Sequence, residues 1–89
     1  MKYNEFDLGQ VKRGQSVEVK ITGTKANVRL LDTANLAAFK AGRQANGYGG
    51  NVTTTAPVRL TIPRDGHWTV VVDYGGCTGS GTASVNLVG

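Results

Sequence analysis

The chain has 89 residues, a length at which one hydrophobic core is usual, so we expect a single β domain over residues 1–89. Apolar residues make up 39% of the chain and charged residues 18%, which excludes an intrinsically disordered protein, and a single cysteine excludes an internal disulfide. The formal net charge of +4 is modest, and it favours a solvated basic surface over the dense basic patch of a dedicated nucleic-acid binder.

The sequence also argues against an exported protein and against a membrane protein. Residues 1–5 lack the apolar core of a signal peptide, and no apolar run approaches the roughly 20 residues that span a bilayer. With one cysteine, nothing points to an oxidising compartment. We therefore expect a cytoplasmic protein that does not contact a membrane.

Short runs in which apolar and polar residues alternate predict most of the structure. Phe6 and Leu8 begin a first strand, and each later run places apolar side chains on one face and mainly polar ones on the other. These later runs are Ser16–Thr22, Ala26–Leu31, Val58–Ile62, Trp68–Tyr74 and Ala83–Leu87. The face assigned to the core carries Val17, Val19, Ile21, Ala26, Val28, Leu30, Val58, Leu60, Ile62, Trp68, Val70, Val72, Tyr74, Ala83, Val85 and Leu87.

Between two of these runs, Pro63–Gly66 has the composition of a tight turn. Proline presets φ, and Asp65-Gly66 tolerates the positive φ of a reversal. Short connections of this kind favour antiparallel pairing. The sequence therefore predicts an all-β fold, a sandwich or flattened barrel of six to seven mostly antiparallel strands.

One segment departs from this alternation and predicts a short helix near 33–41. Asp32 can cap its N-terminus, and Gly42 is placed to end it. Leu36 and Phe39 lie three residues apart on one face, so we expect the helix to plug one end of the sandwich with these two side chains.

Two glycine-rich stretches, Arg43–Ala56 and Gly75–Gly81, are expected to be connecting loops. Neither is followed by a Lys-Ser/Thr pair opening a helix, and neither lies within a βαβ unit, so they do not resemble phosphate-binding loops. The backbone flexibility that a β-hairpin needs explains the glycines of both stretches.

Several pieces that run in order along the chain resemble a known family. They are Phe6–Gly9, Ala26–Asp32, Tyr48–Gly50, Pro57–Leu60 and Gly66–Asp73. Together they are similar to a small bacterial family described as domain of unknown function number eighteen-eighty-three, whose members occur alone or fused to TIR domains. The resemblance implies a compact, mostly β fold and a sensing or recruiting role linked to TIR-type signalling. It supplies no catalytic residues.

Catalysis and metal binding have little support in the residues themselves. His67 is the one histidine, and no recognisable nucleophile or metal partner accompanies it, so a structural pair with Trp68 at the turn is favoured. Cys77 has no neighbouring cation that would activate its thiol. We therefore predict that the chain is not an enzyme, with no catalytic residue, no metal site and no cofactor.

The polar face of the predicted strands gives the candidate binding residues. Arg29, Arg59, Thr69 and Asp73 project from the side opposite the core. If the two Val-Arg-Leu strands are neighbours, their guanidinium groups flank a carboxylate such as Asp73 or Asp32. This pairing is either a structural ion pair or an anion site. In the second reading Arg43 and Tyr48 border the site, with His67 and Trp68 nearby.

The leading function is a non-enzymatic binding or interaction module for an unknown protein or a small anionic ligand, and the role expected of it is that of a sensor or adaptor. Two alternatives stay open. One is a self-associating structural β module that pairs through an exposed strand edge, giving a homo-oligomer. The other is a weak binder of single-stranded nucleic acid, which the modest charge disfavours.

Overall fold

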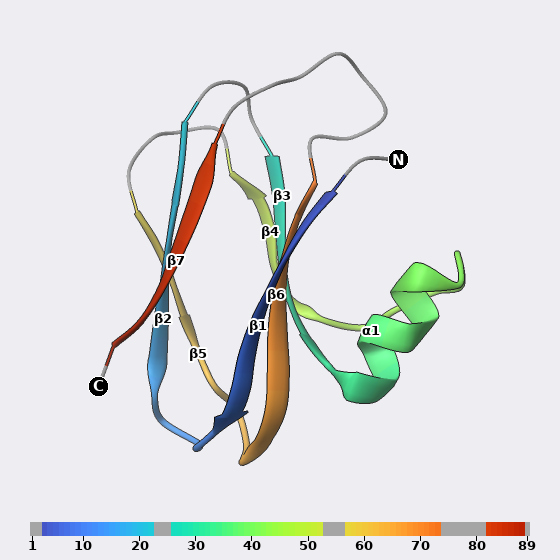
Figure 1. The fold of residues 1–89 in the computed structure, drawn as a ribbon, viewed down its shortest axis with the longest axis horizontal. Coiled ribbons are helices and arrows are strands. Elements are labelled where there is room, and N and C mark those ends of the chain that lie inside the picture. The colour runs from blue at the N-terminus through green and yellow to red at the C-terminus, as the bar shows by residue number, and fades with distance from the viewer. Residues whose placement is uncertain (1–2, 23–25, 53–56, 74–81, 89) are drawn as a thin grey trace.

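Two antiparallel sheets packed face to face form the body of the protein, and one helix lies outside them (Figure 1). The computed structural model describes residues 3–22, 26–52, 57–73 and 82–88. Seven strands lie in these ranges, which confirms the predicted all-β sandwich with one short helix. In spatial order the first sheet contains β1 (Tyr3–Val11), β6 (Gly66–Asp73), β3 (Ala26–Asp32) and β4 (Tyr48–Val52), and the second contains β5 (Val58–Thr61), β2 (Ser16–Ile21) and β7 (Ala83–Val88).

The core lies between the sheets and is made by the predicted face of the central strands. Its fully or nearly fully buried side chains come mainly from β2, β3 and β6, and include Val17, Val19, Val28, Leu30, Trp68, Val70 and Val72. Val58, Leu60 and Val85, on the edge strands β5 and β7, are only partly buried. Leu87 was also assigned to the core, but 44% of it is exposed because, among the described strands, β7 has a neighbour on one side alone.

Strand β4 occupies part of a stretch that the sequence predicts to be a loop. It pairs antiparallel with β3, and Gly49 lies opposite Arg29. A Cβ on Gly49 would lie 2.1 Å from the Val28 carbonyl oxygen, and one on Gly47 would lie 2.5 Å from Leu31 Cδ2. The glycines thus let the chain approach β3 closely, and their lack of side chains removes the alternation that reveals a strand.

The helix α1 (Thr33–Lys40) has the predicted ends. The side chain of Asp32 accepts a hydrogen bond from the Asn35 backbone N–H at 2.8 Å. At the other end Gly42 adopts a φ of +75°, and the Arg43 and Gly42 N–H groups donate to the carbonyls of Ala38 and Phe39 at 2.9 and 3.1 Å. These two bonds form a Schellman motif, which satisfies carbonyls that the helix leaves unpaired.

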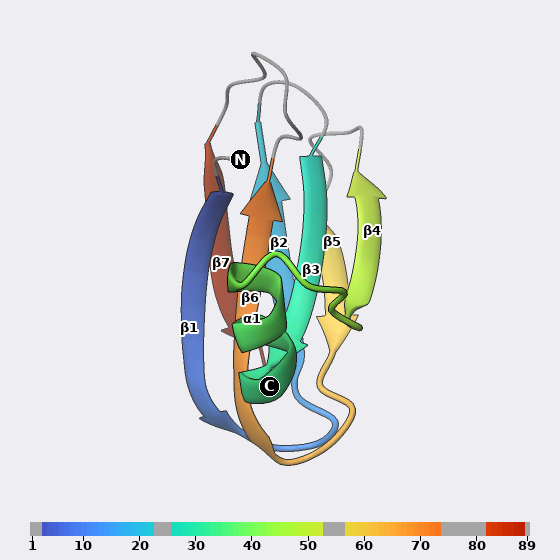
Figure 2. The same cartoon turned by 90° about the vertical axis from the view of Figure 1, so that its right-hand side faces the viewer.

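The position of α1 differs from the prediction. It does not plug an end of the sandwich but lies on the outer face of the first sheet, over β6 and β3 (Figure 2). Leu31 and Val71 lie on that face and are fully buried. Two apolar side chains exposed on an open sheet would favour a cover, and the helix that follows β3 directly supplies it.

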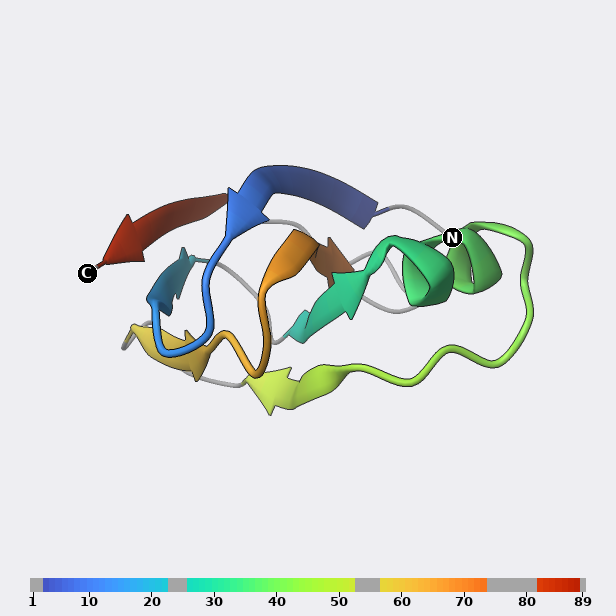
Figure 3. The same ribbon diagram turned by 90° about the horizontal axis from the view of Figure 1, so that it is seen from below.

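Some predicted features lie outside the described residues. These are the continuation of β6 to Tyr74 and the loop Gly75–Gly81 with Cys77. The turn Pro63–Gly66 does lie within them and connects β5 of the second sheet to β6 of the first (Figure 3).

Substitution of Gly49 tests the close approach of β4 to β3. Alanine at Gly14 meets nothing within 4 Å, so Gly14→Ala costs only the left-handed backbone, about 1–2 kcal/mol. Gly49→Ala adds a clash with the Val28 carbonyl, and we expect it to lower the free energy of unfolding by about 1–3 kcal/mol more than Gly14→Ala does. Urea unfolding of both variants measures the difference, and equal losses would contradict the close approach.

Candidate functional site

A buried carboxylate at the end of β6 is the centre of the polar cluster on the outer face of the first sheet. Asp73 is 1% exposed and lies directly opposite Asn27 of β3. Arg29 Nη1 donates to Asp73 Oδ2, and Asn27 Nδ2 donates to Asp73 Oδ1 at 3.1 Å. Because an unpaired buried carboxylate is costly, Arg29 and Asn27 stabilise the position of Asp73. The structure therefore contains the pairing of Arg29 with Asp73 that the sequence suggested.

The helix fixes the Arg29 guanidinium from a second direction. Its Cζ lies 5.4 Å from the centroid of the Phe39 ring, and the Phe39 ring meets Tyr3 edge-on with centroids 5.1 Å apart. Lys40 Nζ lies 3.0 Å from Glu5 Oε1 of β1, which ties the end of the helix to the sheet. Arg29 is thus held by a carboxylate and an aromatic ring, while 36% of its side chain remains exposed.

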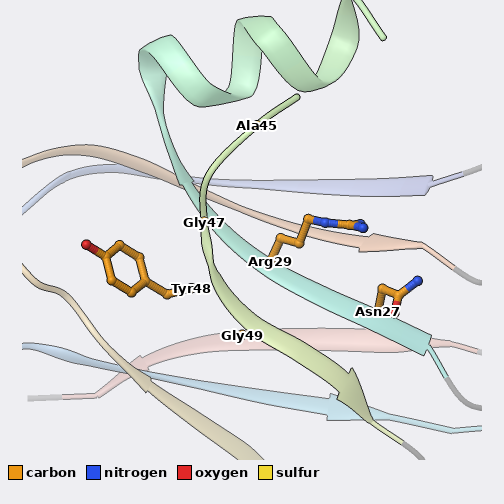
Figure 4. A pocket seen from close by; sticks show the side chains of 6 residues that line it. All are labelled: Asn27, Arg29, Ala45, Gly47, Tyr48 and Gly49. Atoms are coloured by element: carbon orange, nitrogen blue, oxygen red, sulfur yellow. The ribbon is translucent and has the colours of Figure 1, made fainter. Parts of the chain in front are cut away.

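Beside Arg29 the surface has a hollow of about 160 Å³ (Figure 4). Its lining, which we call the Arg29 hollow, consists of Asn27, Arg29, Ala45, Gly47, Tyr48 and Gly49. Arg29 and Asn27 extend from the same side of β3, whereas the Tyr48 ring points away from them (Figure 4). At about 30 Å³ per water molecule, the hollow has room for a group the size of a carboxylate or phosphate.

Tyr48 belongs to a second cluster, which includes Trp68. The two rings meet at an angle of 61° with centroids 6.1 Å apart. Arg64 Cζ lies 5.0 Å from the centroid of Trp68, and Trp68 Nε1 donates to the Arg64 carbonyl oxygen at 3.0 Å. Trp68 is 2% exposed and belongs to the core, so it anchors the turn before β6 instead of lining the Arg29 hollow.

Arg59 does not join Arg29, contrary to the prediction. The two Val-Arg-Leu strands lie in different sheets, β3 in the first and β5 in the second. Arg59 forms an exposed ion pair with Glu18 of β2, with Nη2 and Oε2 3.4 Å apart. Alternation predicts which face of a strand a residue occupies but not which strand is its neighbour.

Arg43 and Asp32 also lie apart from the Arg29–Asp73 pair. Arg43 follows the helix, is exposed, and is not among the residues that line the Arg29 hollow. Asp32 pairs with Arg64 instead. The Asn35 backbone N–H, then its side-chain amide and the Arg64 charge, lower the pKa of Asp32 below its ordinary value.

His67 is exposed, whereas its neighbour Trp68 is buried in the core, so the two side chains lie on opposite faces of β6. His67 Nε2 lies 2.6 Å from Asp7 Oδ1 of β1. The Gly9 N–H also donates to Asp7 Oδ1, at 2.7 Å, across the register shift between Asp7 and Gly9. The Gly9 bond first, and His67 after it, lower the pKa of Asp7. Sequence reasoning missed this pair, although Asp-x-Gly is a recognisable sign of a bulge.

Within the described ranges, no group of three His, Cys, Asp or Glu side chains is placed to hold a metal ion. The one helix found there is far too short to cross a bilayer. The chemistry that the Arg29 hollow offers is hydrogen-bond donation, from the guanidinium of Arg29 and the amide of Asn27.

These features define a small β-sandwich with a helix-covered outer face and a donor-lined hollow beside a buried ion pair. The chain belongs to the family described as Domain of unknown function (DUF1883), whose model matches residues 1–89, the whole chain. This match confirms the resemblance seen in the sequence. No curated protein and no solved structure matches the chain.

The two arginines of the repeated Ala-x-Val-Arg-Leu pattern should differ in their effect on stability. Arg29→Ala removes the Arg29 partner of the buried Asp73 and should lower the free energy of unfolding by about 1–3 kcal/mol. Arg59→Ala removes one exposed ion pair and should change the free energy of unfolding by less than about 0.5 kcal/mol. Urea unfolding of both variants at pH 7 provides the comparison. Equal effects would show that Arg29 does not support Asp73.

Stability should also fall in acid through Asp32. The pKa of Asp32 in the folded protein lies below its ordinary value of 3.8, so its ionised form contributes stability above that pH. The contribution is lost as the pH falls through the lowered pKa. Asp32→Asn keeps a capping oxygen but has no charge to lose. The free energy of unfolding of this variant should therefore fall less steeply between about pH 5 and pH 2 than that of the unaltered chain. Parallel unfolding curves for the variant and the unaltered chain would contradict this.

Proposed function

We propose that this protein is a non-enzymatic binding module that holds the carboxylate or phosphate of a small ligand in the Arg29 hollow. The observation that carries the proposal is that the Arg29 side chain is both held in place and accessible. Its guanidinium is fixed by Asp73 and Phe39 yet partly exposed, and it lines a hollow of about 160 Å³. A donor held in place before the ligand arrives loses little conformational entropy on binding.

The affinity should be modest. Asp73 already offsets the charge of Arg29, so a ligand gains from directed N–H bonds more than from net attraction. Asn27 supplies a second donor group, but it too is shared with Asp73. A dissociation constant of about 1 mM, near −4 kcal/mol, is the scale we expect for a simple anion. A natural ligand would add contacts to Ala45 and the backbone of the β4 segment.

A binding role suits the hollow better than a catalytic one. The side chains with polar groups that line it are Asn27, Arg29 and Tyr48, and none of these is a general base at neutral pH. His67, the residue most suited to acid–base chemistry, pairs with Asp7 on β1 and is not among the lining residues.

A nucleic-acid role has less support from the charges. Five of the cations in the described ranges, Lys20, Arg29, Lys40, Arg59 and Arg64, lie in ion pairs with carboxylates. Each of these cations has a carboxylate beside it, so the five do not form a continuous basic patch. A sensor or adaptor role in the cytoplasm, linked to TIR-type signalling, is the biological setting that we propose for the module.

An NMR titration tests this function. Sodium phosphate and sodium acetate are added to ¹⁵N-labelled protein at constant ionic strength, with sodium chloride as the reference salt. Amide shifts at residues 27–29 and 45–49 should move and saturate in the millimolar range. Shifts that spread over all exposed cations, or that never saturate, would contradict a defined site.

Arg29→Lys and Arg59→Lys form a matched pair of variants for this titration. A lysine at 29 keeps a charge for Asp73, so the fold is preserved, but it lacks the planar fork of donors. We expect binding to weaken at least about fivefold in Arg29→Lys and to stay unchanged in Arg59→Lys. Equal binding by the two variants would place the ligand elsewhere.

A further inference from the structure

The two sheets have four edge strands, and three of them carry features that block pairing with another chain. β1 has a register shift between Asp7 and Gly9 and the charged residues Glu5 and Asp7. β4 contains Gly49 with a φ of +127°. β5 has only four residues, follows Pro57 and contains Arg59. Bulges, charges, prolines and short length are the usual protections of an exposed edge.

The fourth edge strand, β7, has none of these protections. Its six residues, Ala-Ser-Val-Asn-Leu-Val, include no charge, no proline and no glycine. It pairs with β2 on one side, and no strand in the described ranges pairs with the other side. In Figure 3 it lies at the rim of the molecule, and its C-terminal end points away from the other strands.

Exposed apolar side chains gather at the same strand. Among the described residues, three large hydrophobic side chains are exposed, and two of them, Leu87 at 44% and Val88 at 37%, are the last two residues of β7. Neighbouring exposed apolar residues next to an unpaired edge are typical of a contact surface.

We propose that the free edge of β7 pairs antiparallel with β7 of a second copy of this chain, which joins the two three-stranded sheets into one of six strands. In the register centred on Asn86, Asn86 faces its own equivalent, Val85 faces Leu87 of the second copy and Ser84 faces its Val88. This pairing covers the exposed ends of both strands and satisfies the edge N–H and C=O groups.

The composition of β7 favours a second copy over an unrelated strand. In a two-fold symmetric pair, the residue on the axis meets its own equivalent, so a charge there would face a like charge. β1 or β5 would incur that repulsion through Asp7 or Arg59, whereas β7 would not. An edge that pairs with a different protein is under no such restriction.

The dimer should be weak and favoured by salt. One pair of six-residue strands buries less than the roughly 1,200 Å² of a standard stable interface, so association should depend on concentration. Each copy carries a formal net charge of +4, and two copies repel until salt screens that charge. Salt therefore strengthens this association, in contrast to the binding of nucleic acid.

Sedimentation equilibrium of the full chain tests the proposal, from about 10 μM to 1 mM protein in low and high sodium chloride. We expect a reversible monomer–dimer equilibrium whose dissociation constant falls at least about threefold in high salt. Asn86→Lys should raise that constant at least about tenfold, because two lysines then meet near the axis. Asn86 lies opposite Glu18 on β2, so the new ammonium group has a carboxylate beside it and the fold is retained.

Thr61→Lys is the matched control. It places the same charge on β5, the opposite edge of the same sheet, and should leave the dissociation constant unchanged. A monomer at every concentration would overturn the proposal, and so would equal effects of the two lysine variants. Dimerisation of Arg29→Lys should equal that of the unaltered chain, so failure of this proposal is separate from failure of the Arg29 hollow to bind an anion.

Discussion

Covering the outer face of the first sheet is the constraint that determines the rest of the candidate site. Leu31 and Val71 point away from the main core and are nevertheless fully buried, because α1 lies across them. The same helix brings Phe39 against Arg29, whose guanidinium also donates to the buried carboxylate of Asp73 at the end of β6. A buried carboxylate needs a cation and hydrogen-bond donors, which Arg29 and Asn27 provide from β3. Phe39 of α1 thus connects the helix that covers the apolar face to the polar cluster.

The repeated Ala-x-Val-Arg-Leu pattern shows how strongly surroundings change the role of one residue type. Arg29 lies in the first sheet, beside a buried carboxylate and an aromatic ring, and these two groups hold its guanidinium in one orientation. Arg59 lies at an edge of the second sheet, pairs with Glu18 across the strand and is 61% exposed. Exposed pairs of this kind contribute little, since solvent screens the charges and the long side chains lose entropy. The first arginine combines a fixed guanidinium with an adjoining hollow.

Much of this fold was predictable from the sequence, and the errors have specific physical causes. Alternation located six of the strands and the core face, because burial on one side of a sheet enforces a period of two. The ends of α1 were predictable from Asp32 and Gly42, whose capping is local. β4 was missed because Gly49 and Gly50 leave no alternation to see. The position of the helix and the separation of Arg29 from Arg59 depend on which strands become neighbours, and local patterns carry no information about that. In the candidate site, Arg29 and Asp73 were therefore predicted together, and Arg59 was placed wrongly with them.

The two proposed surfaces lie on different parts of the sandwich, and this separation matters for how they would act together. The Arg29 hollow belongs to β3 and β4 of the first sheet, whereas the free edge of β7 belongs to the second. β4 contacts β5 on one side of the sandwich, and β1 contacts β7 on the other, so the hollow and the β7 edge lie toward opposite sides. Pairing through β7 would leave both hollows open and hold them at a fixed separation. Two weak sites held in this way bind a divalent or multimeric partner far more tightly than either site alone, because the second contact becomes intramolecular. A modest affinity at each hollow is therefore compatible with selective recognition by the pair.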